Sequence, residues 1–236
     1  MILKYIVKEN KYQSINQILK QKFKISARLQ HKLITSKQIF LNGNQADSRI
    51  APQINNVITV NLDFNEESEN IIPTPIPLNI IYEDEALLIL DKPAGIAVHP
   101  SISHYTDSLA NGVKYYFDTI GLKRKIRPVN RLDLNTSGLI VFAKNEYVQE
   151  CLIQQMQTNE FKKEYLAIVH GIFENVQGTI NLPIARKENS IIERHISENG
   201  QEAVTHYEVL KTSNDLSLVH CTLQTGRTHQ IRVHMS

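Results

Sequence analysis

The strongest constraint on the fold is the segment 65–79, where an acidic run is followed by prolines at every second position from 73 to 77. Alternate prolines block helix and sheet hydrogen bonds and stiffen an extended path. The charge balance changes sign at this segment. Residues 1–64 carry ten Lys and Arg against three Asp and Glu, whereas residues 65–236 carry 16 against 21. We therefore predict a basic domain at 1–64, a linker at 65–79 and a larger domain at 80–236.

Composition narrows the class of protein further. Of the 236 residues, 42% are hydrophobic, which is enough for packed cores. No run approaches the roughly 18 apolar residues of a membrane helix, and the N-terminus alternates apolar and charged residues, unlike a secretory signal. Cys151 and Cys221 lie far apart in sequence and indicate no disulfide framework. We expect a cytoplasmic monomer with no membrane association.

Two short helices are predicted in the basic domain, at 14–23 and 26–38, with Ser14 and Ser26 as N-caps. Each has a buried stripe at helical spacing, formed by Ile15, Ile18 and Leu19 in the first helix and by Leu29, Leu33 and Ile34 in the second. Arg28, Lys32 and Lys37 can then face water or a ligand. The dipeptide Asn42-Gly43 predicts a hairpin over 39–46, and 57–62 is a closing strand. The basic charge favours a nucleic-acid partner, although a merely solvated face is the alternative.

The larger domain is predicted to be α+β, with a mixed, largely antiparallel sheet flanked by helices. Helical stretches occur near 107–118 and 145–158. Strand-like runs occupy 80–82, 87–91, 139–143, 163–169, 203–210, 216–223 and 229–235. Because strands and helices do not alternate strictly, a doubly wound nucleotide-binding fold is not expected.

The first candidate functional segment is a basic stretch that ends in a single carboxylate. Its cations are Lys123, Arg124, Lys125, Arg127 and Arg131, and the carboxylate is Asp133. A lone aspartate would repel phosphate in a pure binding patch. Its presence is explained if the carboxylate acts on a molecule that the cations hold in place. Aspartate is an ionised nucleophile or base at neutral pH, and the turn-forming residues 135–138 could present it at a strand entrance. The alternative is an Arg–Asp pair that ties down a loop.

The second segment is 223–234, where Gly226 gives a tight turn before an alternating stretch. As a strand, it would place His229, Ile231 and Val233 on one face and Gln230, Arg232 and His234 on the other. Arg232 could then hold a carboxylate ionised. No metal site is expected, because the two histidines would lie on opposite faces with no Cys, Asp or Glu nearby.

The third segment is the alternating run 163–169, in which Tyr165 is either a packed core aromatic or a ring that stacks on an extruded base. Lys92, after strand 87–91, is expected in a turn and in contact with solvent. Ser137 lacks the Gly-x-Ser-x-Gly context of a serine hydrolase. No Gly-rich cofactor loop supports a methyltransferase.

Together these segments resemble the RluA/RluD-type pseudouridine synthases. The family hallmark His-Arg-Leu-Asp-x-x-Thr-Ser-Gly corresponds to residues 130–138, with Asn130 in place of the histidine, and Thr-Gly-Arg-Thr-His-Gln-Ile-Arg-Val-His matches 225–234. Smaller similarities lie at 91–95, 163–167, 181–184 and 200–207. Residues 1–64 resemble, more weakly, a small RNA-binding domain shared with a ribosomal protein.

The resemblance implies roles for single residues. Asp133 would be the nucleophile, Arg131 would replace the target base in the RNA stack, and Tyr165 would stack on the uracil. Arg232 would pair with Asp133, and Ile231 would pack against it. The phosphate contacts would come from Lys123, Arg124, Lys125, Arg127, Arg28 and Lys32.

The expected reaction isomerises uridine to pseudouridine in RNA, most plausibly large-subunit ribosomal RNA, and needs no cofactor. Attack on the ribose and addition to the uracil ring remain equally open. The competing interpretation is a ribosome-assembly protein that binds RNA without catalysis. The chain ends at Ser236, directly after the second motif, so we expect an uncovered sheet edge or core face that lowers stability or activity. Asn130 is expected to affect loop support or substrate choice more than chemistry.

Overall fold

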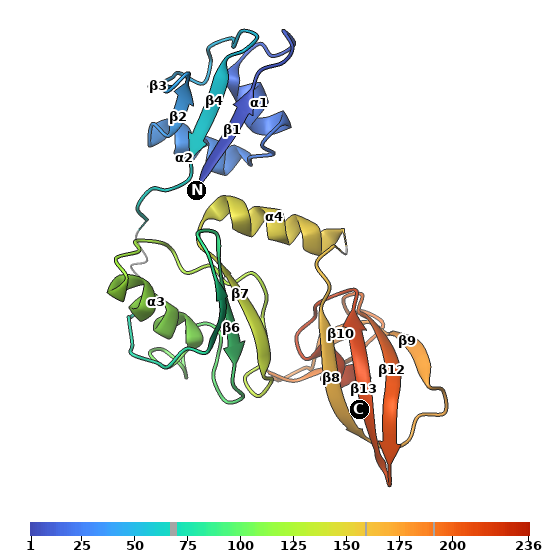
Figure 1. Cartoon of the computed structure of the whole chain (residues 1–236). Helices are drawn as coiled ribbons and strands as arrows, with labels where there is room; N and C mark the ends of the chain where they lie inside the picture. Colours follow the sequence, from blue (N-terminus) through green and yellow to red (C-terminus); the bar gives the residue numbers. More distant parts are fainter. Residues whose placement is uncertain (67–69, 159, 191) are drawn as a thin grey trace. The chain divides into compact units, whose positions relative to one another are not determined.

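The computed structural model describes residues 1–66, 70–158, 160–190 and 192–236 (Figure 1). Contacts divide the chain into two compact units, Met1–Ile153 and Gln154–Ser236. In the part of the chain that is described, no helix is long and apolar enough to cross a membrane.

The first unit begins with an antiparallel sheet of order β1-β4-β2-β3 that packs on two helices. These elements are β1 (Ile2–Ile6), α1 (Ile15–Gln21), α2 (Ala27–Thr35), β2 (Ile39–Leu41), β3 (Asn44–Gln45) and β4 (Val57–Asn61). The predicted hairpin is confirmed, since Asn42 and Gly43 join β2 to β3 with φ of 49° and 83°. The alternating N-terminus forms β1, a strand that the sequence analysis did not predict.

The core of residues 1–64 confirms most of the two predicted helical stripes. Ile15, Ile18 and Leu19 of α1 are buried, as are Leu29 and Leu33 of α2. Ser26 caps α2 by accepting a hydrogen bond from the Leu29 amide, whereas the Ser14 side chain makes no capping hydrogen bond. The prediction for Ile34 was wrong. Its side chain is 41% exposed, because Leu29 and Leu33 alone face the sheet.

The rest of the first unit is an antiparallel sheet of order β5-β6-β7 with helix α3 packed against it. Its elements are β5 (Ile80–Glu83), β6 (Leu87–Lys92), α3 (Leu109–Thr119) and β7 (Gly138–Ala143), and the chain leaves it within helix α4 (Glu146–Gln157). Val113 and Phe117 of α3 meet Leu90 and Ile140 of the sheet in a second core. A capping box between Ser108 and Asn111 begins α3.

The second unit is built on an antiparallel sheet of order β8-β13-β12-β9. Its elements are β8 (Glu164–His170), β9 (Gln177–Asn181), β10 (Ile184–Arg186), β11 (Arg194–Ile196), β12 (Val204–Ser213), β13 (Leu216–Leu223) and α5 (Gln230–His234). Strands β10 and β11 form a separate hairpin and, with β9, were not predicted. Antiparallel sheets with few helices confirm the α+β class.

The predicted strand at 229–235 is wrong, because these residues form helix α5. His229 precedes it in the left-handed region, with φ of 59° and ψ of 22°, and turns the chain after Gly226. In a helix Gln230 and His234 lie on one face and Arg232 on the opposite one. Gln230 and His234 are accordingly buried and Arg232 is exposed. The proposed alternation of Ile231 and Arg232 across a strand therefore does not exist.

Candidate active site

Asp133 lies in a loop that is bound by the buried ammonium group of Lys92. The Lys92 side chain is fully buried, and its Nζ donates to the carbonyl oxygens of Leu134 (2.9 Å), Ile96 (2.8 Å) and Pro93 (3.0 Å). The Gly95 amide also donates to the Leu134 oxygen, at 2.9 Å. The hydrogen bonds from Lys92 and Gly95 thus hold Leu134, the residue that directly follows Asp133. The expectation that Lys92 contacts solvent was therefore wrong.

The same ammonium acts on Asp133 through its charge. Burial lowers the pKa of Lys92, and the Asp133 carboxylate partly offsets this by raising it. The two groups are therefore close enough for their charges to interact. The Asp133 backbone oxygen also accepts a hydrogen bond from the Thr136 amide at 3.1 Å, which closes the predicted turn. The loop thus presents a half-buried carboxylate beside a fixed cation.

Asn130, the departure from the family pattern, bridges the loop to strand β7. Its Nδ2 donates to the Leu139 oxygen and its Oδ1 accepts from the Val141 amide, both at 2.9 Å. The neighbouring Val129 amide donates to the Val141 oxygen at 2.7 Å. This amide side chain therefore continues a strand edge that leads the chain to Asp133.

Arg131 is exposed at the start of the loop, and His99 is its titratable neighbour. The surrounding protein lowers the pKa of His99, and the Arg131 guanidinium lowers it further. A neutral imidazole is therefore favoured near Arg131, and positive charge there is concentrated on the arginine.

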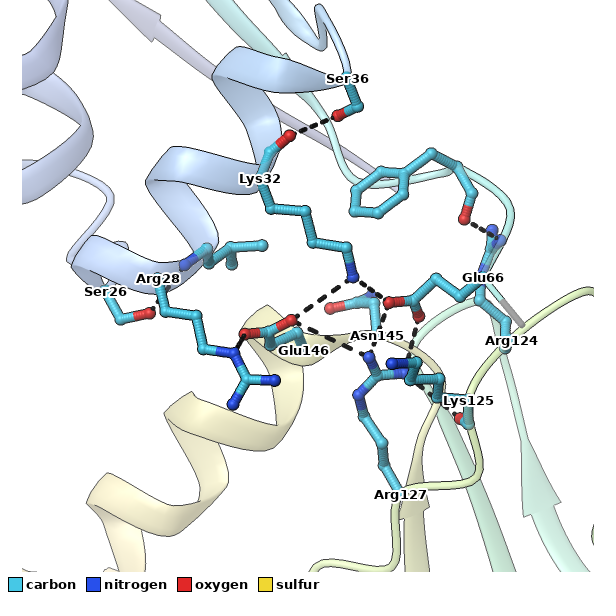
Figure 2. A network of polar contacts seen from close by, with 12 residues as sticks. Ser26, Arg28, Lys32, Ser36, Glu66, Arg124, Lys125, Arg127, Asn145 and Glu146 are labelled. Atoms are coloured by element: carbon cyan, nitrogen blue, oxygen red, sulfur yellow. Dashed lines mark hydrogen bonds and ion pairs between the residues drawn. The ribbon is translucent and has the colours of Figure 1, made fainter. Parts of the chain in front are cut away.

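Two of the cations in the basic stretch 123–131 have carboxylate partners within the first unit, and Figure 2 shows the pair formed by Arg127 and Glu66. The buried Arg127 guanidinium donates to both oxygens of Glu66 at 2.7 Å each. Arg124, also buried, pairs with Asp63 and donates to the Phe64 carbonyl at 2.5 Å. Lys123 and Lys125, in contrast, are exposed.

The carboxylates of Glu66 and Glu146 also bind helix α2 (Figure 2). Lys32 pairs with Glu66 and lies 3.5 Å from Glu146, and Arg28, whose side chain is 86% exposed, lies 3.6 Å from Glu146. Burial alone would raise the pKa of Glu66, but hydrogen bonds from Arg127 and Lys32 outweigh it and lower the pKa. The predicted linker thus contributes a structural carboxylate to this network.

In the second unit Tyr165 lies on β8 opposite Cys221 of β13. It shares a half-buried face with Ala167 and Val169, as predicted, whereas Leu166 and Ile168 on the other face are exposed. The ring is therefore positioned by a regular sheet.

Helix α5, which carries Ile231 and Arg232, is held by buried hydrogen bonds. Gln230 Nε2 donates to the Val204 oxygen (3.0 Å) and to Thr205 Oγ1 (2.9 Å), and its Oε1 accepts from Thr225 Oγ1 (2.8 Å) and the Arg227 amide (2.9 Å). All hydrogen-bonding positions of this amide are used. The five-residue helix therefore has a fixed orientation despite its short length.

His234 provides a second attachment for α5. Its Nε2 lies 3.0 Å from the Leu182 carbonyl and its Nδ1 2.9 Å from Thr205 Oγ1. Because a carbonyl can only accept, Nε2 carries the proton and Nδ1 accepts from the hydroxyl. Sequence reasoning missed the roles of Gln230, His234 and Lys92. All three are polar side chains inside the recognised motifs, and their position there was the available signal.

Comparison with known proteins now gives this site a family. A family model described as RNA pseudouridylate synthase matches residues 86–236. YhcT and YjbO of Bacillus subtilis, each named an uncharacterized RNA pseudouridine synthase, are 38% and 37% identical over 221 and 196 residues. These alignments cover 93% and 83% of this chain, and 73% and 69% of the relatives. A ribosomal large subunit pseudouridine synthase D from Blochmanniella floridana is 39% identical over 171 residues, 72% of this chain and 53% of its own length.

Among solved structures, human RNA pseudouridylate synthase domain containing 4 aligns with a TM-score of 0.55 and 26% identity. The alignment covers 67% of this chain and 63% of the human one. Fold, motifs and matches together define an RNA-modifying isomerase. The chain belongs to the RNA pseudouridylate synthase family, which confirms the predicted enzyme class and disfavours the non-catalytic alternative.

Proposed function

We propose that this chain converts selected uridines of large-subunit ribosomal RNA to pseudouridine, with Asp133 as the nucleophile. The observation that carries the proposal is the Asp133 loop, in which the buried Lys92 ammonium binds the adjacent Leu134 carbonyl at 2.9 Å and interacts electrostatically with the Asp133 carboxylate. The ribosomal substrate is supported by the relatives named large subunit pseudouridine synthase D.

The reaction breaks the bond between the ribose and nitrogen 1 of uracil and joins the ribose to carbon 5. No electrons are gained or lost and no group is imported, so no cofactor is required. Asp133 either assists departure of the base at the ribose or adds to carbon 6 of the ring. In both routes the carboxylate must be ionised and directed at a base outside its stack.

The other predicted residues act on the RNA or on Asp133. Extruding the base costs a few kcal/mol, and stacking on Tyr165, worth about 1–3 kcal/mol per base, would offset much of that cost. Arg131 would occupy the space that the base leaves. Arg232 would pair with Asp133, with Ile231 packed alongside. This pairing stays a prediction.

Residues 1–64 would serve as a small RNA-binding module. The supporting features are the charge balance of +7 and the exposed Arg28 side chain on α2. Exposed Lys123 and Lys125 would add phosphate contacts in the larger domain. Such contacts fix position without reading sequence. The cytoplasmic location and the monomeric state also stay predictions.

The direct test is release of tritium from RNA labelled at carbon 5 of uracil. Asp133→Asn should lower release by on the order of 10³-fold or more, because the amide is no longer a nucleophile, and should leave RNA affinity within about three-fold. Asp118→Asn, which changes a partly exposed carboxylate paired with Lys114 on α3, is the matched control and should keep normal release.

Two results would contradict the proposal in different ways. Normal release by Asp133→Asn would reject Asp133 as the nucleophile. Tight RNA binding by the unmodified chain without any release would favour the assembly-protein function instead.

A further inference from the structure

The hairpin β10–β11 places two arginines directly opposite each other. In its antiparallel register Arg186 pairs with Arg194, next to the pairs Ala185–His195 and Ile184–Ile196. Directly opposed residues project from the same face with Cβ atoms about 5 Å apart, and like charges there are destabilising. The chain thus carries a repulsive pair in a hairpin of only three residues per strand.

These arginines line a cavity of about 860 Å³ within the second unit. Arg232 and His229, at helix α5, line the same cavity. Its full-charge cations are Arg186, Lys187, Arg194 and Arg232, and its carboxylates are Glu188 and Glu193. The side chains that line the cavity therefore sum to a charge of +2 before any histidine is protonated.

Among the described residues, neither arginine forms an ion pair with a carboxylate of the cavity. Glu193 pairs with Lys187 at 2.8 Å, in an exposed ion pair at the hairpin end. Arg194 uses Nη1 to donate to the carbonyl oxygens of Ile192 (3.1 Å) and Glu193 (3.0 Å), which holds its guanidinium against the backbone directly before β11. A guanidinium has five N–H donors, so Arg194 keeps others for an anion.

We propose that Arg186 and Arg194 form a phosphate clamp that binds one phosphodiester of the RNA strand beside the modified uridine. This inference rests on the proposed function, which places Arg232, from the same cavity, at the reacting carboxylate. Two opposed guanidinium forks fit the oxygens of a phosphodiester. A bound phosphate would also relieve their mutual repulsion.

The clamp predicts opposite effects of one substitution on binding and on stability. Arg186→Gln should raise the Kd for a fluorescent oligouridylate of about 12 nucleotides roughly five-fold at low salt. It should also reduce the slope of log Kd against log salt by about 0.7, the value for one phosphate contact on a single strand. Yet its Tm should rise by about 1–3 °C, because a like-charge pair is removed.

Lys211→Gln is the matched control, since it removes one exposed cation from β12 of the same unit and does not line the cavity. It should leave the Kd, the salt slope and the Tm close to those of the unmodified chain. An equal loss of affinity in both variants would mean that only overall charge matters, which rejects the clamp. A lower Tm for Arg186→Gln would equally reject the premise of a repulsive pair.

Tritium release separates this proposal from the proposed function. Arg186→Gln should raise KM and leave kcat within about two-fold, because a phosphate contact binds substrate and transition state alike. Unchanged KM and affinity, with normal release by the unmodified chain, would remove the clamp and keep the function. Absence of release by the unmodified chain would overturn both the function and the placement of the clamp beside a modified uridine. Binding of polyglutamate as tightly as oligouridylate would show an acidic-protein site instead.

Discussion

The arginines of the first unit and those of hairpin β10–β11 carry the same charge but have opposite neighbours. Arg127 is buried and binds both oxygens of Glu66, whereas Arg186 is exposed and faces Arg194 across the hairpin. The first arrangement stabilises the protein and leaves little affinity for an outside anion. The second arrangement lowers the stability of the protein and attracts an outside anion. The number of basic residues in a segment therefore does not identify the cations that contact RNA.

Of the substitutions that test this contrast, removal of the Glu66 charge should have the largest effect. Glu66→Gln removes the carboxylate that accepts two hydrogen bonds from the buried Arg127 guanidinium and leaves Glu146 at 4.0 Å, so the free energy of unfolding should fall by about 3 kcal/mol in urea titrations at pH 7. Glu9→Gln, in an exposed ion pair with Lys11, is the control and should change it by less than about 0.5 kcal/mol. A small effect of Glu66→Gln would mean that the network adds little to stability.

The same variant has a predictable pH dependence. The folded pKa of Glu66 lies below its ordinary value of 4.5. Its ionised form therefore stabilises the fold fully above pH 4.5, and this contribution is lost as the pH falls through the lower folded pKa. The stability gap between the unmodified chain and Glu66→Gln should be constant near neutrality and should shrink on acidification below that value.

A double substitution asks whether Arg127 has any role in RNA binding. Glu66→Leu with Arg127→Met removes both charges of the buried pair, and Lys32, which loses Glu66, keeps Glu146 at 3.5 Å. Stability should therefore lie within about 1 kcal/mol of the unmodified chain. Oligouridylate affinity and its salt slope should also be unchanged, because Arg127 contacts Glu66 and not phosphate. A drop in the salt slope of about 0.7 would mean that Arg127 contacts a phosphate, as predicted from the sequence.

The smallest effect should come from reversing one charge of the hairpin. Arg194→Glu converts a like-charge pair into an opposite-charge pair and should stabilise the chain by about 0.5 kcal/mol. It should weaken oligouridylate binding more than Arg186→Gln does, because it both removes a cation and adds an anion. Tighter RNA binding by this variant would refute the contrast between the two regions.

Local rules recovered much of the fold from sequence. Ser26 caps α2, Asn42-Gly43 turns the first hairpin, and the turn after Asp133 is closed by Thr136. Each of these features depends on residues within four positions of one another. Helices α3 and α4 were likewise found from short apolar patterns.

Long-range contacts account for what was missed. The run His-Gln-Ile-Arg-Val-His has the alternating pattern of a strand. Gln230, however, donates hydrogen bonds to Val204 and Thr205, which lie some 25 positions earlier, and the segment forms helix α5. Glu66 meets Arg127 across 61 positions, which turns a predicted linker carboxylate into part of a buried network. Lys92 is buried because Leu134, 42 positions later, supplies a carbonyl. No local pattern encodes such partners.

Asn130 has a consequence for the loop that follows it. The family pattern has an imidazole at this position, a ring that exchanges a proton near pH 6.5 and changes from acceptor to donor as it does so. A carboxamide has no such transition. Its hydrogen bonds to Leu139 and Val141 therefore persist from mildly acidic to alkaline solution, and the approach to Asp133 keeps one geometry throughout that interval.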